Sequence, residues 1–356
     1  MIFHGVRADA AQAAQQQAQK HGLIKLSHWN TLPCPTVYPK SQRVSRKTSQ
    51  LCHVSFWKGG NNTKQPVFIG CGTALVTPFR GGAVDLDAFR ALVARQLDAR
   101  IDALIVCATT GEAPTLRDAE RSALISACVE LAAHRAPVIV GTGSNDTAHA
   151  VALSRSAEAL GADGVLVVTP YYNKATQAGL IAHYTAVADA VQIPVILYNV
   201  PSRTGVSFTA ETYAALSAHP NICGVKEASG SFQLIQDTLN RCADFSVWSG
   251  NDEDTAALMA LGGAGVISTA ANLIPAEMRE LTHLALSGSL HKAGLLQLRM
   301  TELLRALFCE VNPIPVKTAM ARLGLCTEEL RLPLCAMQPG NRERLFAAMD
   351  AYGVKA

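Results

Sequence analysis

The sequence of 356 residues lacks the short motifs that identify metalloproteins and membrane proteins. Its ten cysteines include no CxxC pair, and no cysteine or histidine cluster has the spacing of zinc ligands. No apolar run reaches the roughly 18 residues that a membrane-spanning helix needs. Because the cysteines are scattered from Cys34 to Cys335 without pairing motifs, we expect a cytoplasmic protein with reduced thiols, no metal site and no membrane segment.

Signatures of nucleotide and nucleic-acid binding are also missing. No GxxxxGK(S/T) motif occurs, and Gly141 and Gly143 lack the third glycine of a dinucleotide-binding fingerprint. Residues 1–65 hold nine Lys or Arg against one acid, Asp9, so the remaining chain carries a net charge of −5. A mildly acidic body does not favour nucleic-acid binding. We therefore expect no cofactor and no nucleic-acid partner.

Residues 1–65 differ from the rest of the chain in composition. They are polar and basic and lack sustained apolar periodicity, which predicts a disordered extension. The shortage of acids also fits a transit peptide. Codons for Lys58-Gly59-Gly60 can resemble a ribosome-binding sequence, which would place the translation start after them.

From residue 66, short β-branched runs alternate with helical stretches rich in alanine and leucine. Continuous apolar strands are buried on both faces, and helices between them imply parallel pairing. Eight such units predict an α/β fold, a catalytic (β/α)8 TIM barrel over residues 66–289, with an open doubly wound sheet as the alternative. The strands are expected at 71–76, 103–107, 137–142, 164–169, 194–199, 222–227, 245–249 and 264–269. The helices expected with most support are 87–99, 118–133, 148–160 and 177–191.

Residues 290–356 are expected to form a C-terminal helical region. Apolar residues recur there at helical spacing. The helices are expected at 292–308, 317–323 and 342–352.

In a TIM barrel the active site lies at the carboxyl ends of the strands. Lys226 ends the apolar run Cys223-Gly224-Val225 there. A desolvated lysine amine tends to lose its charge, and a neutral amine forms imines with ketones. A salt bridge to Glu227 or to another carboxylate is the structural alternative. Other polar residues follow the predicted strands, namely Thr109, Thr110, Glu112, Thr169, Tyr171, Tyr172, Asn173, Tyr198, Asn199, Ser202, Arg203, Thr204, Ser249, Asn251 and Asp252.

These residue types also complement one another chemically. The protonated imine of a 2-keto acid is an electron sink, which lets the adjacent methyl carbon lose a proton and become a nucleophile. A tyrosine held by Thr109 and a second tyrosine can shuttle protons. Thr110 offers donors to the keto acid's carboxylate, and Arg203 offers a planar fork to a second carboxylate. The residues therefore predict condensation of a keto acid with a second, acidic substrate.

Six segments match, in order, the motifs of one known family: 109–112, 168–173, 197–205, 224–230, 262–267 and 312–317. Through them, residues 66–345 resemble the dihydrodipicolinate synthase family of pyruvate-dependent class I aldolases. The resemblance implies condensation of pyruvate with L-aspartate 4-semialdehyde to 4-hydroxy-tetrahydrodipicolinate, in lysine and diaminopimelate biosynthesis. It implies no metal, because the imine replaces the metal as electron sink.

The resemblance also implies a role for each matching residue. Lys226 would form the Schiff base, Tyr198 would donate and accept protons, and Thr109 would link Tyr198 to Tyr172. Tyr172 would enter the neighbouring subunit's site, so the expected assembly is a homo-oligomer, as a dimer of dimers (homotetramer). Thr110 and Ile267 would bind pyruvate, Arg203 would bind the semialdehyde carboxylate, and Gly250 would be a further substrate-binding residue.

Two other functions are kept as alternatives. N-acetylneuraminate lyase and the 2-keto-3-deoxy sugar acid aldolases share the lysine, but Arg203 in its loop is the form typical of the synthase. A catalytically silent barrel acting as a binding protein would be expected to lack Lys226 or Tyr198, and both are present.

One departure from the family pattern concerns regulation. In lysine-inhibited members an acidic residue and histidines face a bound lysine, whereas the matching positions here are His149, Asp118 and Arg121. A cationic amino acid would lose its carboxylate partner at His149. We therefore predict weak or absent lysine feedback, with some residual binding through Asn145 and Tyr171.

Overall fold

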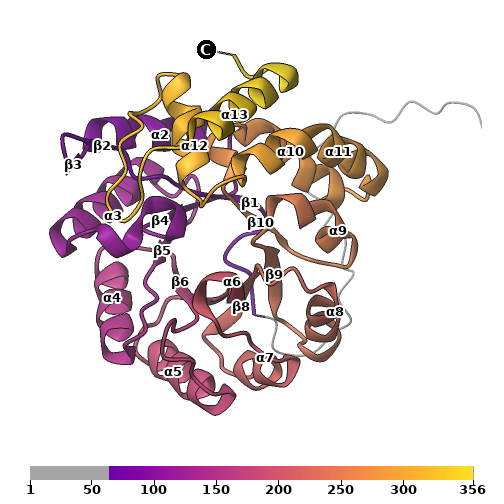
Figure 1. Ribbon diagram of the computed structural model, residues 1–356. Helices are drawn as coiled ribbons and strands as arrows, with labels where there is room; N and C mark the ends of the chain where they lie inside the picture. Colours follow the sequence, from indigo (N-terminus) through magenta and orange to yellow (C-terminus); the bar gives the residue numbers. More distant parts are fainter. Residues whose placement is uncertain (1–63, 356) are drawn as a thin grey trace, which may run out of the picture. The chain divides into compact units, whose positions relative to one another are not determined.

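Eight parallel strands close into a barrel with the order β1-β10-β9-β8-β7-β6-β5-β4 (Figure 1). The computed structural model describes residues 64–355. Every strand lies within two residues of its predicted position, so the TIM barrel is confirmed and the open sheet is wrong. The strands are β1 (Gly70–Ala74), β4 (Ala103–Val106), β5 (Val138–Gly141), β6 (Gly164–Val168), β7 (Val195–Asn199), β8 (Ile222–Glu227), β9 (Ser246–Ser249) and β10 (Gly265–Ser268).

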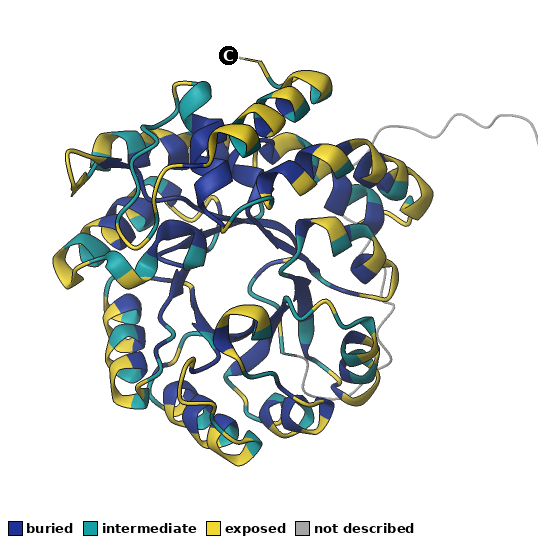
Figure 2. Ribbon diagram, in the orientation of Figure 1, coloured by how far each residue is buried: buried dark blue, intermediate teal, exposed yellow. Residues whose placement is uncertain are grey.

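Alternate side chains of each strand enter two different apolar cores. Ile139 of β5 and Ile196 of β7 lie in a cluster inside the barrel. Their neighbours Val138, Val140 and Leu197 lie in a larger cluster between the strands and the helices. The barrel strands are accordingly buried along their length (Figure 2). This two-sided burial explains why the strands read as continuous apolar runs rather than as alternating ones.

A helix follows each strand of the barrel and packs outside it (Figure 1). Five of these helices begin beside a capping side chain, Asp85, Asp146, Thr176, Thr209 or Ser231, which accepts a hydrogen bond from a backbone N–H of the first turn. Each such cap stabilises its helix by about 1 kcal/mol. The helices are α2 (Leu86–Asp98), α3 (Asp118–Ala132), α4 (Thr147–Ala159), α5 (Gln177–Asp189), α7 (Ala210–Ser217), α8 (Phe232–Arg241), α9 (Thr255–Ala260) and α10 (Pro275–Leu286).

Several short elements were not predicted from the sequence. The antiparallel strands β2 (Phe79–Arg80) and β3 (Ala83–Val84) form a hairpin between β1 and α2. Single helical turns follow four of the barrel strands at their carboxyl ends. Elements of two to four residues are too short to show a period in the sequence. The helical turns are η1 (Thr109–Gly111), η2 (Ala113–Thr115), α6 (Pro201–Thr204), η3 (Asp252–Asp254) and η4 (Ala270–Asn272).

The C-terminal region is helical, as predicted, and its three helices lie together along one side of the barrel (Figure 1). Helix α11 (Leu290–Leu307) packs on α10, and α13 (Pro339–Tyr352) packs on α11 and α12 (Ile314–Arg322). Helix α12 also contacts η4, and residues 314–320 are all buried. The C-terminal region is therefore part of the core and reaches the carboxyl ends of the strands.

The predicted N-terminal extension, residues 1–65, lies outside the described residues except for Lys64 and Gln65. The Lys64 Nζ donates to the main-chain oxygens of Ser217 (2.5 Å), His219 (2.5 Å) and Ile222 (3.1 Å). It thereby satisfies carbonyl groups around the end of α7, which have no partner within the helix. The three interpretations of the extension stay predictions.

Candidate active site

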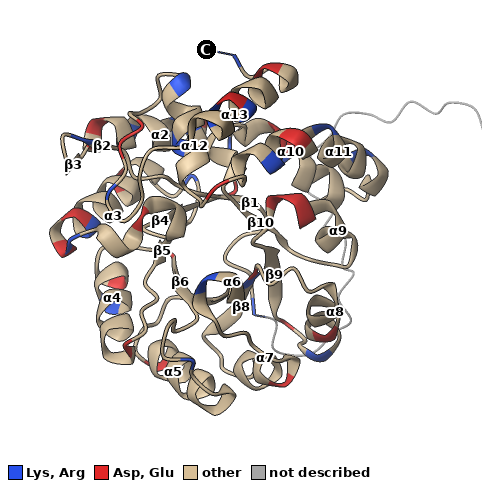
Figure 3. Cartoon of the chain, in the orientation of Figure 1, with Lys and Arg blue, Asp and Glu red and all other residues tan. Residues whose placement is uncertain are grey.

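Strand β8 differs from the other strands of the barrel because it carries charge. Within the described barrel, Lys226 and Glu227 are the only charged residues on a strand. The other charged residues lie mainly on the surrounding helices and loops (Figure 3). Both of these charged side chains are nevertheless buried, with Lys226 4% and Glu227 3% exposed. Two buried charges on one strand call for separate explanations, since neighbouring side chains point to opposite faces.

Lys226 points into the barrel. Val225, one residue before it, belongs to the cluster under the helices, so the next side chain faces the interior. In register with Lys226 lie Tyr198 on β7 and Trp248 on β9, and both belong to the interior cluster. The Lys226 Nζ lies 4.6 Å from the centroid of the Tyr198 ring. The predicted Schiff-base lysine and the predicted proton shuttle are therefore neighbours.

Glu227 points the opposite way and is bound by other groups. Its carboxylate accepts hydrogen bonds from Asn199 Nδ2 (3.1 Å to each oxygen), the Tyr213 hydroxyl (2.6 Å) and the Ser229 N–H (2.8 Å). Burial, followed by the charge of Glu227, raises the pKa of Tyr213 well above its ordinary value. The structural alternative, a salt bridge from Lys226 to Glu227, is therefore wrong.

Asp252 is a buried carboxyl group whose pKa is affected by the charge of Lys226. It lies just beyond β9 and is 2% exposed. Its Oδ2 accepts hydrogen bonds from the N–H groups of Thr269 and Ala270 (both 3.1 Å). Burial raises the pKa of Asp252, while hydrogen bonds and the Lys226 charge act in the opposite direction. No salt bridge to Lys226 occurs within residues 64–355, so its amine is not held by a carboxylate there.

Gly250 fits its predicted place because the backbone passes close to the lysine side chain. A Cβ at this position would lie 2.6 Å from the Cβ of Ala228 and 3.2 Å from the Cε of Lys226. The Gly250 N–H donates to the Glu227 carbonyl oxygen (2.7 Å), which fixes the turn after β9 against β8. Ile267, the other predicted pyruvate residue on this side, is 1% exposed in the interior cluster with Tyr198. A residue larger than glycine at position 250 would therefore clash with Ala228 and crowd the Lys226 side chain.

A cavity of ≈ 380 Å³ lies at the carboxyl ends of the strands. Thr109, Tyr198 and Arg203 line it, whereas Lys226, Gly250, Ile267 and Thr110 are not among its lining residues. Thr110 is 2% exposed, with its Oγ1 3.2 Å from the Oγ1 of Thr269. Asn312, from the C-terminal region, donates through Nδ2 to the Oγ1 of Thr110 (3.0 Å). Seven of the eight predicted site residues thus gather around one end of the barrel.

The eighth predicted residue, Tyr172, lies apart from this group. Its side chain is 89% exposed, and its backbone has a φ of +70°, which is uncommon for a residue other than glycine. Within the described residues, no hydrogen bond links Thr109 to Tyr198 or Tyr172, so the predicted relay is not formed in a single chain. An exposed aromatic residue held in a rare backbone conformation suits a contact outside its own subunit.

The residues considered for lysine feedback line the same cavity. Asp118, Arg121, His149 and Tyr171 all contribute to its wall. The guanidinium of Arg121 donates to the main-chain oxygens of Gly141 (2.8 Å) and Ala113 (3.1 Å), which holds the cation in place. The cavity wall therefore carries a fixed positive charge near His149.

Comparison with known proteins places this geometry in a family. A profile of the family described as "Dihydrodipicolinate synthetase family" matches residues 67–352. The chain belongs to this family. The resemblance drawn from the six motifs is confirmed, and the family match includes the C-terminal helices as well as the barrel.

Relatives from this family match the chain over nearly their whole length. The 4-hydroxy-tetrahydrodipicolinate synthase of Geobacter sulfurreducens is 50% identical over 287 residues, 80% of this chain and 99% of the relative. The structure of dihydrodipicolinate synthase from Thermotoga maritima has a TM-score of 0.80 at 44% identity and covers 81% of this chain and 100% of its own. The Acinetobacter baumannii enzyme complexed with pyruvate has a TM-score of 0.79 at 40% identity and covers 80% and 99%.

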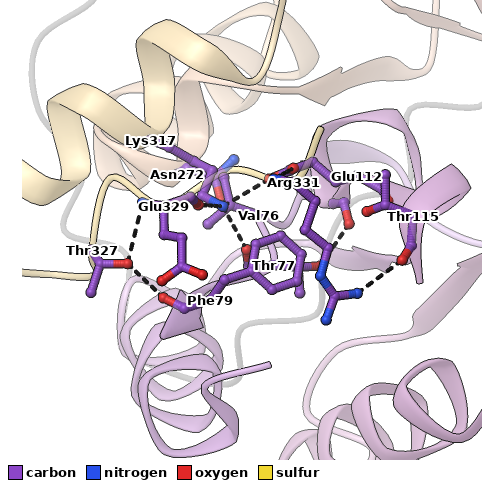
Figure 4. Close-up of polar contacts among 11 residues, drawn as sticks. Val76, Thr77, Phe79, Glu112, Thr115, Asn272, Lys317, Thr327, Glu329 and Arg331 are labelled. Atoms are coloured by element: carbon purple, nitrogen blue, oxygen red, sulfur yellow. Dashed lines mark hydrogen bonds and ion pairs between the residues drawn. The ribbon is translucent and has the colours of Figure 1, made fainter. Parts of the chain in front are cut away.

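A second buried lysine was missed as a feature of the site, although it ends the family motif at 312–317. Lys317 on α12 is 0% exposed and lies in a network drawn in Figure 4. Its Nζ donates to Glu112 Oε1 (2.7 Å), the Thr77 carbonyl (3.0 Å) and the Glu329 carbonyl (2.5 Å). Burial lowers the pKa of Lys317, against the opposing effect of Glu112. The available signal was the same as for Lys226, a cation within an apolar run.

Arg331 extends this network to α3. Its guanidinium makes two bonds to Glu120, Nη1 to Oε2 (2.7 Å) and Nη2 to Oε1 (2.5 Å), and its N–H donates to Glu112. The hydrogen bonds from Arg331, chiefly, lower the pKa of Glu120 to about 2. Together with Lys317, Arg331 ties the C-terminal region to the loop that carries Thr109 and Thr110 (Figure 4).

The described residues contain no group of three or more His, Cys, Asp or Glu side chains placed to hold a metal ion. None of the helices in this part of the chain is long and apolar enough to cross a membrane. The eight cysteines that the structure describes are all free.

Proposed function

We propose that the protein condenses pyruvate with L-aspartate 4-semialdehyde to form 4-hydroxy-tetrahydrodipicolinate, as a lyase of lysine and diaminopimelate biosynthesis. The observation that supports this most is the Lys226 amine, buried inside the barrel beside Tyr198 with no carboxylate partner in the described chain. The 50% identity to a relative that bears the name of this synthase supports the choice of reaction. The contact of Arg203 with the cavity favours a second substrate that carries a carboxylate over a neutral sugar-derived aldehyde.

The chemistry proceeds through an imine. The neutral amine of Lys226 adds to the keto carbon of pyruvate, and the hydroxyl group of the adduct takes up a proton and leaves as water, which gives a protonated imine. The methyl group then loses a proton to give an enamine, and its carbon forms a bond to the aldehyde carbon of the semialdehyde while the aldehyde oxygen takes a proton. The amine of the second substrate then displaces Lys226 and closes the ring. Tyr198, whose ring lies against the Lys226 Nζ, is the group placed to carry these protons.

The remaining residues bind the two substrates. The Thr110 hydroxyl is proposed to donate to the carboxylate of pyruvate, beside Ile267 and the turn at Gly250. Arg203 follows β7 on α6, lines the cavity and has a guanidinium able to pair with the carboxylate of the semialdehyde. Two carboxylate sites on either side of the lysine would bring the keto acid and the aldehyde into contact.

Assembly is proposed to complete the site. Tyr172 is exposed and would extend into a neighbouring copy, where it would meet the Tyr198 and Thr109 hydroxyls. The proposed minimal active unit is a dimer and the proposed assembly is a homotetramer, a dimer of dimers. We place the enzyme in the cytoplasm, in line with its unpaired cysteines.

The test is to trap the imine. Wild-type protein and the K226A variant are incubated with pyruvate and borohydride, and the intact mass of each is measured. We expect a reduced pyruvyl adduct on the wild type and none on K226A. Circular dichroism of both proteins serves as the control for folding. An unmodified but folded wild type would refute the aldolase mechanism and favour the silent barrel. If the adduct forms, turnover with the semialdehyde and with sugar-derived aldehydes decides between the synthase and the sugar acid aldolases.

A further inference from the structure

Asn312 contacts residues on two separate loops at the mouth of the barrel, although it lies outside the barrel in the C-terminal region. It lies between α11 and α12 in the C-terminal region and is 8% exposed. Its side-chain Nδ2 donates to the Oγ1 of Thr110 (3.0 Å), and its main-chain oxygen accepts from the Nη2 of Arg203 (3.2 Å). Thr110 follows β4 and Arg203 follows β7, with two strands between them. One residue therefore touches both groups that are proposed to bind substrate carboxylates.

The amide of Asn312 restricts the hydroxyl of Thr110. A threonine hydroxyl has one hydrogen to donate and two lone pairs that accept. The amide N–H only donates, so it occupies one lone pair of the Thr110 oxygen. The Thr269 hydroxyl lies 3.2 Å away, and either of the two hydroxyls can be the donor. The Thr269 N–H donates to Asp252 (3.1 Å). The Asn312 contact thus leaves the Thr110 hydrogen for Thr269 or for an anionic ligand, and when a ligand accepts it, Thr269 can donate to the second lone pair.

A contribution to the stability of the fold does not explain why position 312 is an asparagine. Its Oδ1 is buried and has no hydrogen-bond partner within the described chain. A buried acceptor without a partner destabilises a fold, whereas an apolar side chain of similar size would not. The donor end of the amide, which meets Thr110, is therefore the end that the site uses.

We propose that Asn312 is a positioning residue for the keto acid, holding the Thr110 hydroxyl as a donor toward the carboxylate of pyruvate. This inference rests on the proposed function, which places pyruvate at Thr110. The side chain and the main chain of Asn312 have separate tasks, since only the main-chain oxygen contacts Arg203. A change of the side chain therefore weakens binding of the keto acid and leaves binding of the aldehyde substrate intact.

The experiment uses the full-length, assembled protein and titrates pyruvate in the borohydride trapping reaction without aldehyde. The pyruvate concentration that gives half of the maximal adduct is expected to rise about tenfold in N312A. This is the effect expected when the group that binds a charged ligand loses one hydrogen bond that orients it. N312D is nearly isosteric but accepts where asparagine donates, so it captures the Thr110 hydrogen and repels the carboxylate. Its half-saturation is expected to rise further, on the order of a hundredfold. The KM for the semialdehyde is expected to stay within about twofold in N312A.

The T110V variant is the matched control. In the T110V background, adding N312A is expected to leave the half-saturation for pyruvate unchanged, because the hydroxyl that it positions is gone. Equal rises in pyruvate half-saturation and semialdehyde KM, or an N312A effect that persists in T110V, would overturn the inference. Urea unfolding of each variant identifies loss of folding. A wild type that forms no adduct contradicts the proposed function, whereas an adduct with unchanged half-saturation in N312A contradicts this inference alone.

Discussion

Two buried lysines lie near the mouth of the barrel, and their surroundings differ. Lys317 is 0% exposed, pairs with Glu112 and donates to two carbonyl oxygens, so all three of its hydrogens are used. Lys226 is 4% exposed, its Nζ lies 4.6 Å from the centroid of the Tyr198 ring, and it has no salt bridge in the described chain, although its charge opposes the rise that burial causes in the pKa of Asp252. Burial is therefore not what distinguishes a reactive lysine from a structural one.

The difference lies in what each ammonium group gains from its partners. A buried charge is tolerated when hydrogen bonds and a counter-ion offset its desolvation, and the resulting network holds segments together. An amine whose hydrogens are not taken up by such partners is free to attack a carbonyl carbon. The same substitution at the two positions should thus have opposite consequences for activity and for stability.

The largest effect is expected for K226M, which removes the amine that is proposed to react. Methionine fills a similar volume without a nucleophile, so kcat should fall on the order of 10⁴-fold or more. The free energy of unfolding, measured in urea, should stay within about 1 kcal/mol of wild type, because no ion pair is lost. Activity within tenfold of wild type would contradict the assignment of Lys226.

The next largest effect is expected for K317M, the matched substitution in the structural lysine. It leaves the Glu112 carboxylate buried without its counter-ion, which destabilises by about 3–5 kcal/mol. The measurement is urea unfolding, together with specific activity per folded molecule, which should remain close to wild type. A stable K317M protein without activity would reverse the two roles.

The double variant E112Q/K317M sharpens that result. Removing both charges leaves no buried ion without a partner, so the free energy of unfolding should recover by about 1–3 kcal/mol relative to K317M. Additive losses in the double variant would show that the pair acts through packing and not through charge.

A smaller effect is expected for the more exposed ion pair between Glu120 and Arg331. Because the pKa of Glu120 is lowered from its ordinary 4.5 to about 2, the pair stabilises the folded protein above pH 4.5. This contribution is lost as pH falls toward 2. E120Q should therefore be less stable than wild type at pH 7 by about 1 kcal/mol, with the gap closing below pH 4. Urea unfolding across this pH range checks it, and a gap that widens in acid would contradict the pairing.

The smallest effect is expected for inhibition by free lysine, whose amine would enter the cavity from solution. Arg121 is fixed in the cavity wall, which His149 also lines, and neither side chain offers a carboxylate to a cation. Lysine at about 1 mM, an affinity scale of roughly −4 kcal/mol, should inhibit by less than half. H149E should increase the inhibition. Half-inhibition of wild type below that concentration would refute the prediction.

Much of the fold could be predicted because the strands and helices of the barrel each leave a local pattern of apolar residues in the sequence. Each strand is a short apolar run buried on both faces, and each outer helix has its own period. The hairpin β2–β3 and the helical turn α6 could not be predicted, because two to four residues show no period. The single turns η1 and α6 at strand ends carry Thr109, Thr110 and Arg203, so the detailed shape of the site depends on the least predictable parts of the chain.

The sequence by itself determined the barrel, the family and the candidates Lys226, Tyr198 and Arg203, because these depend on residue type and order along the chain. Only the tertiary structure decided the partners of each charge. Glu112 and Lys317 are 205 residues apart in the chain, and Asn312 is 202 residues from Thr110. In the sequence both lysines are cations in apolar runs. Within residues 64–355, closure of the barrel and packing of α12 give Lys317 a counter-ion and leave Lys226 without one, and that difference supports the roles proposed for them.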